Sequence, residues 1–121
     1  MSTKFAVIAV WAEDVLANVH FYRDVLGLEL LSHHGSRPHI RVGGVYLTVL
    51  KGSPMPAQNA DPDHFPLFAL SVENLDEMVK RLEEYHIALP WGVGSGTEER
   101  WVMFHDLAGN LIELVQFGEQ K

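Results

Sequence analysis

The chain has 121 residues, a length typical of one domain, and its 47% hydrophobic and 21% charged residues are ordinary for a soluble globular protein. Sixteen acidic and nine basic residues give a formal net charge of −7, and the basic residues are scattered, which argues against a nucleic-acid partner. The lack of cysteine excludes disulfides and thiolate metal sites. No apolar run has the ~18 residues of a membrane-spanning helix or the form of a signal peptide, so we expect no membrane partner and a cytoplasmic location.

The first half of the chain predicts a strand, a helix and three strands. Residues 5–11, rich in Val and Ile, predict a buried strand. A helix is expected to begin at Asp14, a good N-cap, and to stop at Gly27, since apolar residues recur between them at spacings of three and four. Strand-like runs follow at residues 28–33, 39–42 and 45–50, with a Gly-Gly hairpin turn at 43–44.

The pattern restarts after a linker that is rich in Pro and Gly. Residues 67–72 predict a strand, and Asn74 caps a helix with Glu77 in a capping-box-like arrangement. A short apolar run at 88–91 precedes the Gly-rich stretch 92–97. Residues 101–105 and 111–117 then predict a hairpin around residues 106–110.

This restart is an internal repeat. Ala9, Asp14 and Val19 match Ala69, Asn74 and Val79 at an offset of 60, and Gly43 matches Gly109 at an offset of 66. We therefore predict an α+β fold in one domain, residues 1–121, made of two βαβββ modules at 5–50 and 65–117 with a linker at 51–64.

Two segments resemble the signatures of a known superfamily. The segment DVLANVHFYRDVLGL at 14–28 resembles the helix signature of the vicinal oxygen chelate superfamily, also called the glyoxalase/bleomycin resistance/extradiol dioxygenase superfamily. The segment FHDLAGNLIEL at 104–114 resembles its hairpin signature, with Leu107 and Ala108 in place of the usual Pro-Asp. The resemblance implies a cupped mixed sheet that holds a small-molecule ligand, and a homodimer. Because relatives range from lyases and dioxygenases to binding proteins, the fold does not settle the function.

The resemblance also implies where a divalent metal would be held. One ligand position lies seven residues before the helix cap, at Val7 and Leu67 in the two modules. Another lies four residues after the hairpin glycine, at Leu47 and Glu113. Three aliphatic side chains offer no donor, and a lone carboxylate holds a metal poorly, so we expect no cofactor.

Several readings of the remaining candidates stay open. Glu113 has three possible roles. It could be a structural carboxylate bonded to a neighbouring Arg or His, an acid or base with a raised pKa, or a counter-ion for a cationic ligand. Strand alternation places Trp101, Met103 and His105 on one face, where they would suit an apolar or aromatic ligand or simply pack in the core. His64, three residues before Leu67, would be a metal ligand only if a bulge near Pro66 reversed its side.

The leading hypothesis is a metal-independent, bleomycin-resistance-like protein that binds a small apolar or aromatic ligand through Val7, Leu47, Leu67, Trp101, Met103 and His105. The alternative is a divalent-metal-dependent lyase, isomerase or dioxygenase that uses Glu113 with non-standard ligands such as His64. A metal-free enzyme with Glu113 as its acid or base lies between the two.

Overall fold

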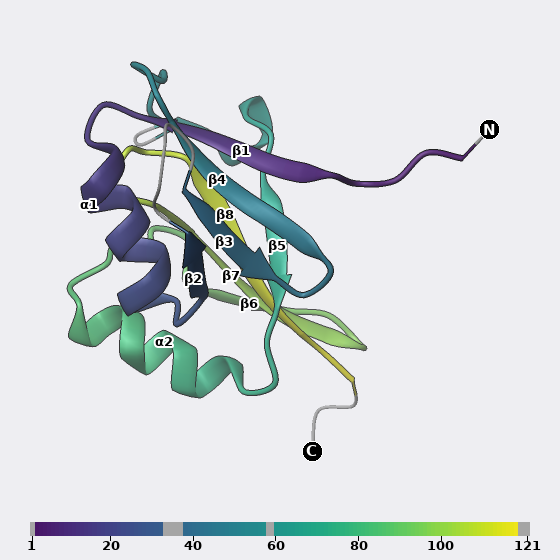
Figure 1. Cartoon of the computed structure of the whole chain (residues 1–121). Helices are drawn as coiled ribbons and strands as arrows, with labels where there is room; N and C mark the ends of the chain where they lie inside the picture. Colours follow the sequence, from purple (N-terminus) through teal and green to yellow (C-terminus); the bar gives the residue numbers. More distant parts are fainter. Residues whose placement is uncertain (1, 33–37, 58–59, 119–121) are drawn as a thin grey trace. The chain divides into compact units, whose positions relative to one another are not determined.

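The computed structural model describes residues 2–32, 38–57 and 60–118 (Figure 1). The chain divides into two compact units, Met1–Met55 and Pro56–Lys121. Each unit contains a four-stranded mixed sheet, with the order β1-β4-β3-β2 in the first and β5-β8-β7-β6 in the second. In both sheets the first and last strands of the unit pair in parallel, and the other pairs are antiparallel. The predicted α+β class and the predicted repeat of one strand, one helix and three strands are thereby confirmed.

The first unit follows the predicted order of elements. Its elements are β1 (Val7–Ala12), α1 (Val15–His20), the π-helical turn η1 (Phe21–Val25), β2 (Glu29–Ser32), β3 (His39–Val42) and β4 (Val45–Lys51). The N-cap is Asp14, whose carboxylate accepts a hydrogen bond from the backbone N–H of Ala17 at 3.0 Å. The core of this unit lies on the face of the sheet that α1 contacts, and includes Val19, Tyr22, Ile40 and Leu47.

The second unit repeats the arrangement with a longer helix. Its elements are the 3-10 turn η2 (Pro62–His64), β5 (Phe68–Ser71), α2 (Leu75–Glu84), β6 (Val93–Ser95), β7 (Glu99–His105) and β8 (Leu111–Phe117). The face of the sheet toward α2 is fully apolar at its centre, where Val102, Phe104 and Ile112 have no exposed surface. Burying such side chains contributes roughly 1.5–3 kcal/mol each.

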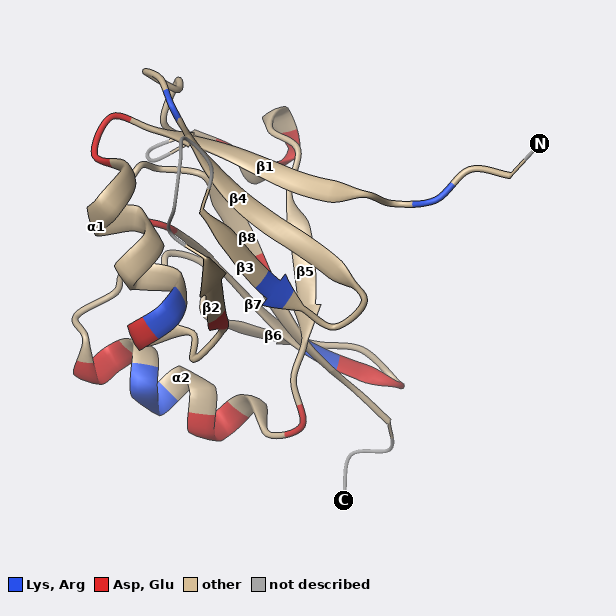
Figure 2. Cartoon of the chain, in the orientation of Figure 1, with Lys and Arg blue, Asp and Glu red and all other residues tan. Residues whose placement is uncertain are grey.

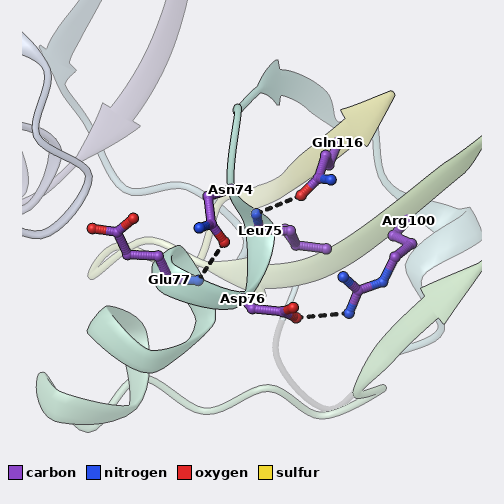
Figure 3. Close-up of polar contacts among 6 residues, drawn as sticks. All are labelled: Asn74, Leu75, Asp76, Glu77, Arg100 and Gln116. Carbon is purple, nitrogen blue, oxygen red and sulfur yellow. Dashed lines mark hydrogen bonds and ion pairs between the residues drawn. The ribbon is translucent and has the colours of Figure 1, made fainter. Parts of the chain in front are cut away.

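The start of α2 is attached to the sheet by polar contacts (Figure 3). Asn74 accepts a hydrogen bond from the N–H of Glu77 at 3.0 Å, as the sequence predicts for an N-cap. Gln116 on β8 accepts from the N–H of Leu75 at 2.8 Å, and Arg100 on β7 pairs with Asp76 at 2.7 Å. Because two strands contribute these contacts, the helix start is fixed over the β7–β8 hairpin.

One strand lies later than the sequence suggests. The apolar run at 88–91 forms no strand, because Pro90 lies within a turn in which the N–H of Gly92 bonds the Leu89 carbonyl at 3.2 Å. The strand in this region is β6, inside the Gly-rich stretch. The predicted end of the second strand at His33 lies outside the described residues. No helix in the part of the chain that the structure describes has the length and apolar character needed to span a bilayer.

Candidate functional site

The second sheet has one face toward α2 and one without a helix, which we call the second open face. It carries Trp101, Met103 and His105 on β7 and Glu113 on β8, all half-buried. The register pairs Met103 with Glu113, and Glu113 in turn with Ala69 on β5. The structure therefore brings four of the residues predicted from the sequence to one surface.

Trp101 lies across the neighbouring strand. Gly94 on β6 is its register partner, and a Cβ at Gly94 would stand only 2.4 Å from the indole. A side chain at this position would displace the ring, so the glycine is required for the tryptophan to lie against β6. The sequence signal for this contact is a glycine inside a strand, although the sequence alone shows Gly94 only as part of a Gly-rich stretch.

His105, at the end of β7, lies beside Trp91. The two ring centroids are 5.6 Å apart, and the rings are tilted by 51°. Burial lowers the pKa of His105 below its usual value, an effect that outweighs a hydrogen bond to the backbone of Ala57 and the charge of Asp106, which both raise it. Its Nε2 atom is buried and has no hydrogen-bond partner among the described residues.

Glu113 has no ionic partner among the residues that the structure describes. Burial alone raises the pKa of its carboxyl above the usual range, and no side chain among the described residues bonds to it. The structural reading, a carboxylate held by an adjacent Arg or His, is therefore not supported within the described part of the chain. A carboxyl that is desolvated and unpaired is suited to proton transfer or to a cationic group.

Leu67 and His64 lie outside the strands. Leu67 immediately precedes β5 and is 41% exposed. His64 lies in η2, with its side chain 66% exposed and its Nε2 3.8 Å from a carboxylate oxygen of Asp63. His64 thus does not stand at the start of the β5 strand, and a bulge near Pro66 does not bring it there. With Asp61 and Asp63 it forms an exposed group whose donor atoms lie within 4.8 Å of one another.

The face of the first sheet away from α1 is the first open face. Val7 and Trp11 on β1 and Tyr46 on β4 lie on it, with exposed fractions of 42%, 50% and 40%. Trp11 lies over Gly52, where a Cβ would come within 2.7 Å of the indole. Each unit therefore holds one tryptophan on its open face above a glycine.

Leu47 does not lie on this face. It is 1% exposed and pairs with Ile8 and Ile40, on the side that α1 covers. The register also corrects its equivalence with Glu113. Ala69 pairs with Glu113, and its repeat counterpart Ala9 pairs with Thr48.

Thr48 is therefore the counterpart of Glu113. Counting from the hairpin glycine misses it by one residue. Both glycines stand two residues before the next strand, but the residue opposite the repeat alanine is the third after Val45 in β4 and the second after Leu111 in β8. The sequence does carry a signal, since Thr48 and Glu113 are each a polar residue between two buried aliphatic ones. Thr48 is 3% exposed, and its hydroxyl donates a hydrogen bond to the Pro38 carbonyl at 2.6 Å.

The donor set at these equivalent positions does not fit a catalytic metal. Such centres take about three nitrogen or oxygen ligands from the protein. Val7 and Leu67 have no donor atom, and the hydroxyl of Thr48 is engaged within its own unit. Glu113 is the one carboxylate among the four residues.

Charged side chains are sparse on the strands (Figure 2). They gather on α2 and in the loops, whereas the sheets are drawn mostly in tan. On the first open face Arg41 lies 3.5 Å from Glu29, so that pair is largely neutralised. Around Met103 the second open face is therefore mainly aromatic and apolar, with the carboxyl of Glu113 and the imidazole of His105 beside it. Glu99 lies on the same side at the start of β7.

Comparison with known proteins places this arrangement among relatives. The chain shares 25% identity and a TM-score of 0.72 with a lactoylglutathione lyase from Agrobacterium tumefaciens, over 96% of this chain and 95% of that one. A glyoxalase/dioxygenase from Nostoc punctiforme has a TM-score of 0.81 at 24% identity, over 96% and 92% of the two chains. An antibiotic-binding protein from a Streptomyces species has a TM-score of 0.76 at 24% identity, over 97% and 98%.

No curated protein sequence matches the chain significantly. A family model does, and it matches residues 4–114, which include both signature segments, the first sheet, and the second sheet up to Leu114 in β8. The chain belongs to the Glyoxalase/Bleomycin resistance protein/Dioxygenase superfamily.

Proposed function

We propose that this protein binds a small apolar or aromatic molecule, without a metal ion, at the second open face. The observation that carries the proposal is the donor set at the four equivalent positions. Val7 and Leu67 have no donor atom, and the hydroxyl of Thr48 is neutral, buried and bonded within its own unit, so Glu113 is the one strong metal ligand among the four. Leu67, exposed beside β5, remains a proposed contact of this ligand, and Val7, exposed on the first open face, remains a proposed ligand contact of its own unit. Leu47 is buried beneath α1 and is not one.

The side chains of the second open face support this ligand class. An indole and a thioether offer apolar contact surface, and Met103 is well suited to contact an aromatic ring through its sulfur. Trp101 is already held against β6, so little conformational entropy would be lost on binding. The Streptomyces neighbour is named as an antibiotic-binding protein, which agrees with this proposal at the level of the fold.

Metal analysis tests the first half of the proposal. Protein purified without chelator should carry well under one equivalent of metal, and Mn, Fe, Ni, Zn and Mg should not raise its melting temperature through Glu113. Stoichiometric metal that disappears in Glu113→Gln would overturn the proposal in favour of the metal-dependent lyase, isomerase or dioxygenase. Asp63→Asn is the matched control, because it removes a donor from the exposed group in η2 and leaves Glu113 intact.

A panel of aromatic and cationic compounds tests the second half. A compound present at 100 times its Kd stabilises the folded state by about 2.7 kcal/mol, which a thermal shift detects. Met103→Asp should abolish such shifts, because it places a charge at the centre of the second open face. Leu107→Asp, at an exposed position on the β7–β8 hairpin, should leave them unchanged. Equal shifts in both variants would show that the ligand binds elsewhere.

Catalysis without metal is the second candidate, and the raised pKa of Glu113 favours it. Turnover of a bound compound that is lost in Glu113→Gln, with binding retained, would establish it. We also propose a homodimer, which resemblance to the superfamily suggests. Sedimentation at several protein concentrations would test the assembly independently of ligand binding.

A further inference from the structure

The imidazole of His105 carries an acceptor that nothing in the described chain uses. Its Nε2 is buried and without a hydrogen-bond partner among the described residues. Buried polar atoms of this kind are rare, and each calls for an explanation. Its position on the second open face, in line with Met103 and Trp101, suggests that a ligand supplies the missing partner.

The backbone of Ala57 determines which nitrogen carries the proton. The hydrogen bond to Ala57 raises the pKa of the ring and therefore favours an N–H, so the imidazole donates to the carbonyl oxygen. Since Nε2 has no partner, the donor is Nδ1. A neutral imidazole with its proton on Nδ1 presents a lone pair at Nε2.

Ala57 is itself fixed. It is 3% exposed, and its N–H donates to the carbonyl of Gly109 in the β7–β8 turn at 3.0 Å. Because Ala57 is itself held to the β7–β8 turn, its carbonyl can fix the tautomer and the orientation of His105. Such second contacts commonly pre-orient a histidine that acts on a ligand.

Trp91 lies beside the imidazole of His105. It is 38% exposed, and it belongs to the turn before β6. Rotation of this side chain would break no hydrogen bond of the sheet, because Trp91 pairs with no strand. The ring can therefore give way to a ligand, or stack on one.

We propose that Nε2 of His105 accepts a hydrogen bond from a hydroxyl group of an aromatic ligand whose ring packs on Met103. Residues two apart on a strand lie about 7 Å apart on one face, so a ring on Met103 can direct a substituent toward His105. The proposal rests on the proposed function and specifies its ligand class. A ligand with only an ether or a carbonyl at that point would leave Nε2 unpaired, and the site would discriminate against it.

A pair of probes tests this inference separately from the proposed function on which it rests. 2-Naphthol and 2-methoxynaphthalene differ in the one donor, and quenching of tryptophan fluorescence reports binding of both. The protein should bind 2-naphthol about tenfold more tightly, a usual effect of one satisfied buried acceptor. Equal affinities would overturn the inference and leave the proposed function standing. Binding of neither probe would overturn the inference as well, and the broader compound panel would then decide the function.

Two variants of His105 sharpen the test. His105→Asn retains a donor near the position of Nδ1 for the Ala57 carbonyl but has no atom at Nε2, so it should lose the preference for 2-naphthol. His105→Gln can place its amide oxygen near the position of Nε2 and should keep part of that preference. The opposite ranking would contradict the proposed role of Nε2.

The tautomer can be measured on the unmodified protein, whatever the variants do to folding. Nitrogen NMR of the imidazole should show a protonated Nδ1 and an unprotonated Nε2, with the Nε2 signal moving on addition of 2-naphthol. The His105→Asn spectrum identifies the signals. A proton on Nε2 in the free protein would refute the inference.

Discussion

The two sheets share their strand order and their parallel pairing of first and last strands, yet their equivalent polar residues have different surroundings. Thr48 in the first sheet is buried and bonded to the Pro38 carbonyl within its own unit. Glu113 in the second is partly buried and has no partner among the described residues. The repeat has thus kept the backbone at this position, while one side chain stabilises its unit and the other is available to a ligand.

The tryptophans, unlike the polar residues, have similar surroundings in the two units. Trp11 lies over Gly52 and Trp101 over Gly94, so both units keep an aromatic side chain on the open face above a glycine. The glycine and the ring must be retained together, because any Cβ at either glycine would clash with the indole. The two rings do not stand at equivalent positions of the repeat, since Trp11 on β1 corresponds to Ser71 and Trp101 lies on β7. The units therefore share this packing feature but not its place in the sheet.

The largest expected effect is the difference in stability between substitutions on the two faces of the first sheet. Leu47→Asp would bury an unpaired charge beneath α1, so we expect a loss of about 4 kcal/mol or more in the free energy of unfolding, enough to unfold the unit. Val7→Asp, on the exposed side, should cost about 1 kcal/mol or less. Urea titration followed by circular dichroism measures both.

Leu47→Met is the control, since a swap that conserves volume should cost less than about 1.5 kcal/mol. Equal tolerance of Leu47→Asp and Val7→Asp would mean that the register of β4 is shifted by one residue. Thr48 would then face α1, and its equivalence with Glu113 would fail.

How much the sequence can predict depends on whether an element's own residues decide it. The caps Asp14 and Asn74 and the strands at 39–42 and 111–117 follow from local patterns, and the structure confirms them. The register of β4 against β1 does not, because it depends on the parallel pairing of two strands that are far apart in the chain, with Val7 opposite Tyr46. The position of β6 depends on the packing of Trp101 against Gly94, which no local propensity reports.

The same distinction applies to the candidate site. Alternation along β7 suffices to place Trp101, Met103 and His105 on one face, and pairing with β8 adds Glu113. The contacts of His105 with Ala57 and Trp91 join residues far apart in the chain, so sequence periodicity gives no sign of them. Site residues that share a strand are predictable, and those supplied by linkers and turns are not.

A smaller effect tests the structural role assigned to Thr48. Thr48→Val conserves the shape of the side chain and removes its donor, which leaves the Pro38 carbonyl unpaired in a buried position. We expect a loss of about 1–3 kcal/mol in the free energy of unfolding. Thr48→Ser retains the hydroxyl and should recover part of the loss. If Thr48→Val were neutral, the hydroxyl would not be structural, and the contrast with Glu113 would weaken.

The smallest effect concerns Glu113 and depends on pH. Because burial raises its pKa in the folded state, the folded protein keeps this proton to a higher pH than the unfolded chain. The stability that the protonated carboxyl contributes is therefore present below the usual value of 4.5 and is lost as the pH rises through the folded pKa. Glu113→Gln cannot titrate, so its melting temperature relative to the original protein should rise across that window and be constant below it.

His105 titrates in both proteins, and its contribution cancels in this difference as long as the two side chains act independently. A difference that stays constant with pH would show that Glu113 is as well solvated as in the unfolded chain. Glu113 would then resemble an ordinary surface carboxylate and would lose its claim to proton transfer. A difference of the expected sign would show that the carboxyl of Glu113 is desolvated without a partner in the free protein. A ligand-binding face can use such a group, whereas a purely structural face has no need of it.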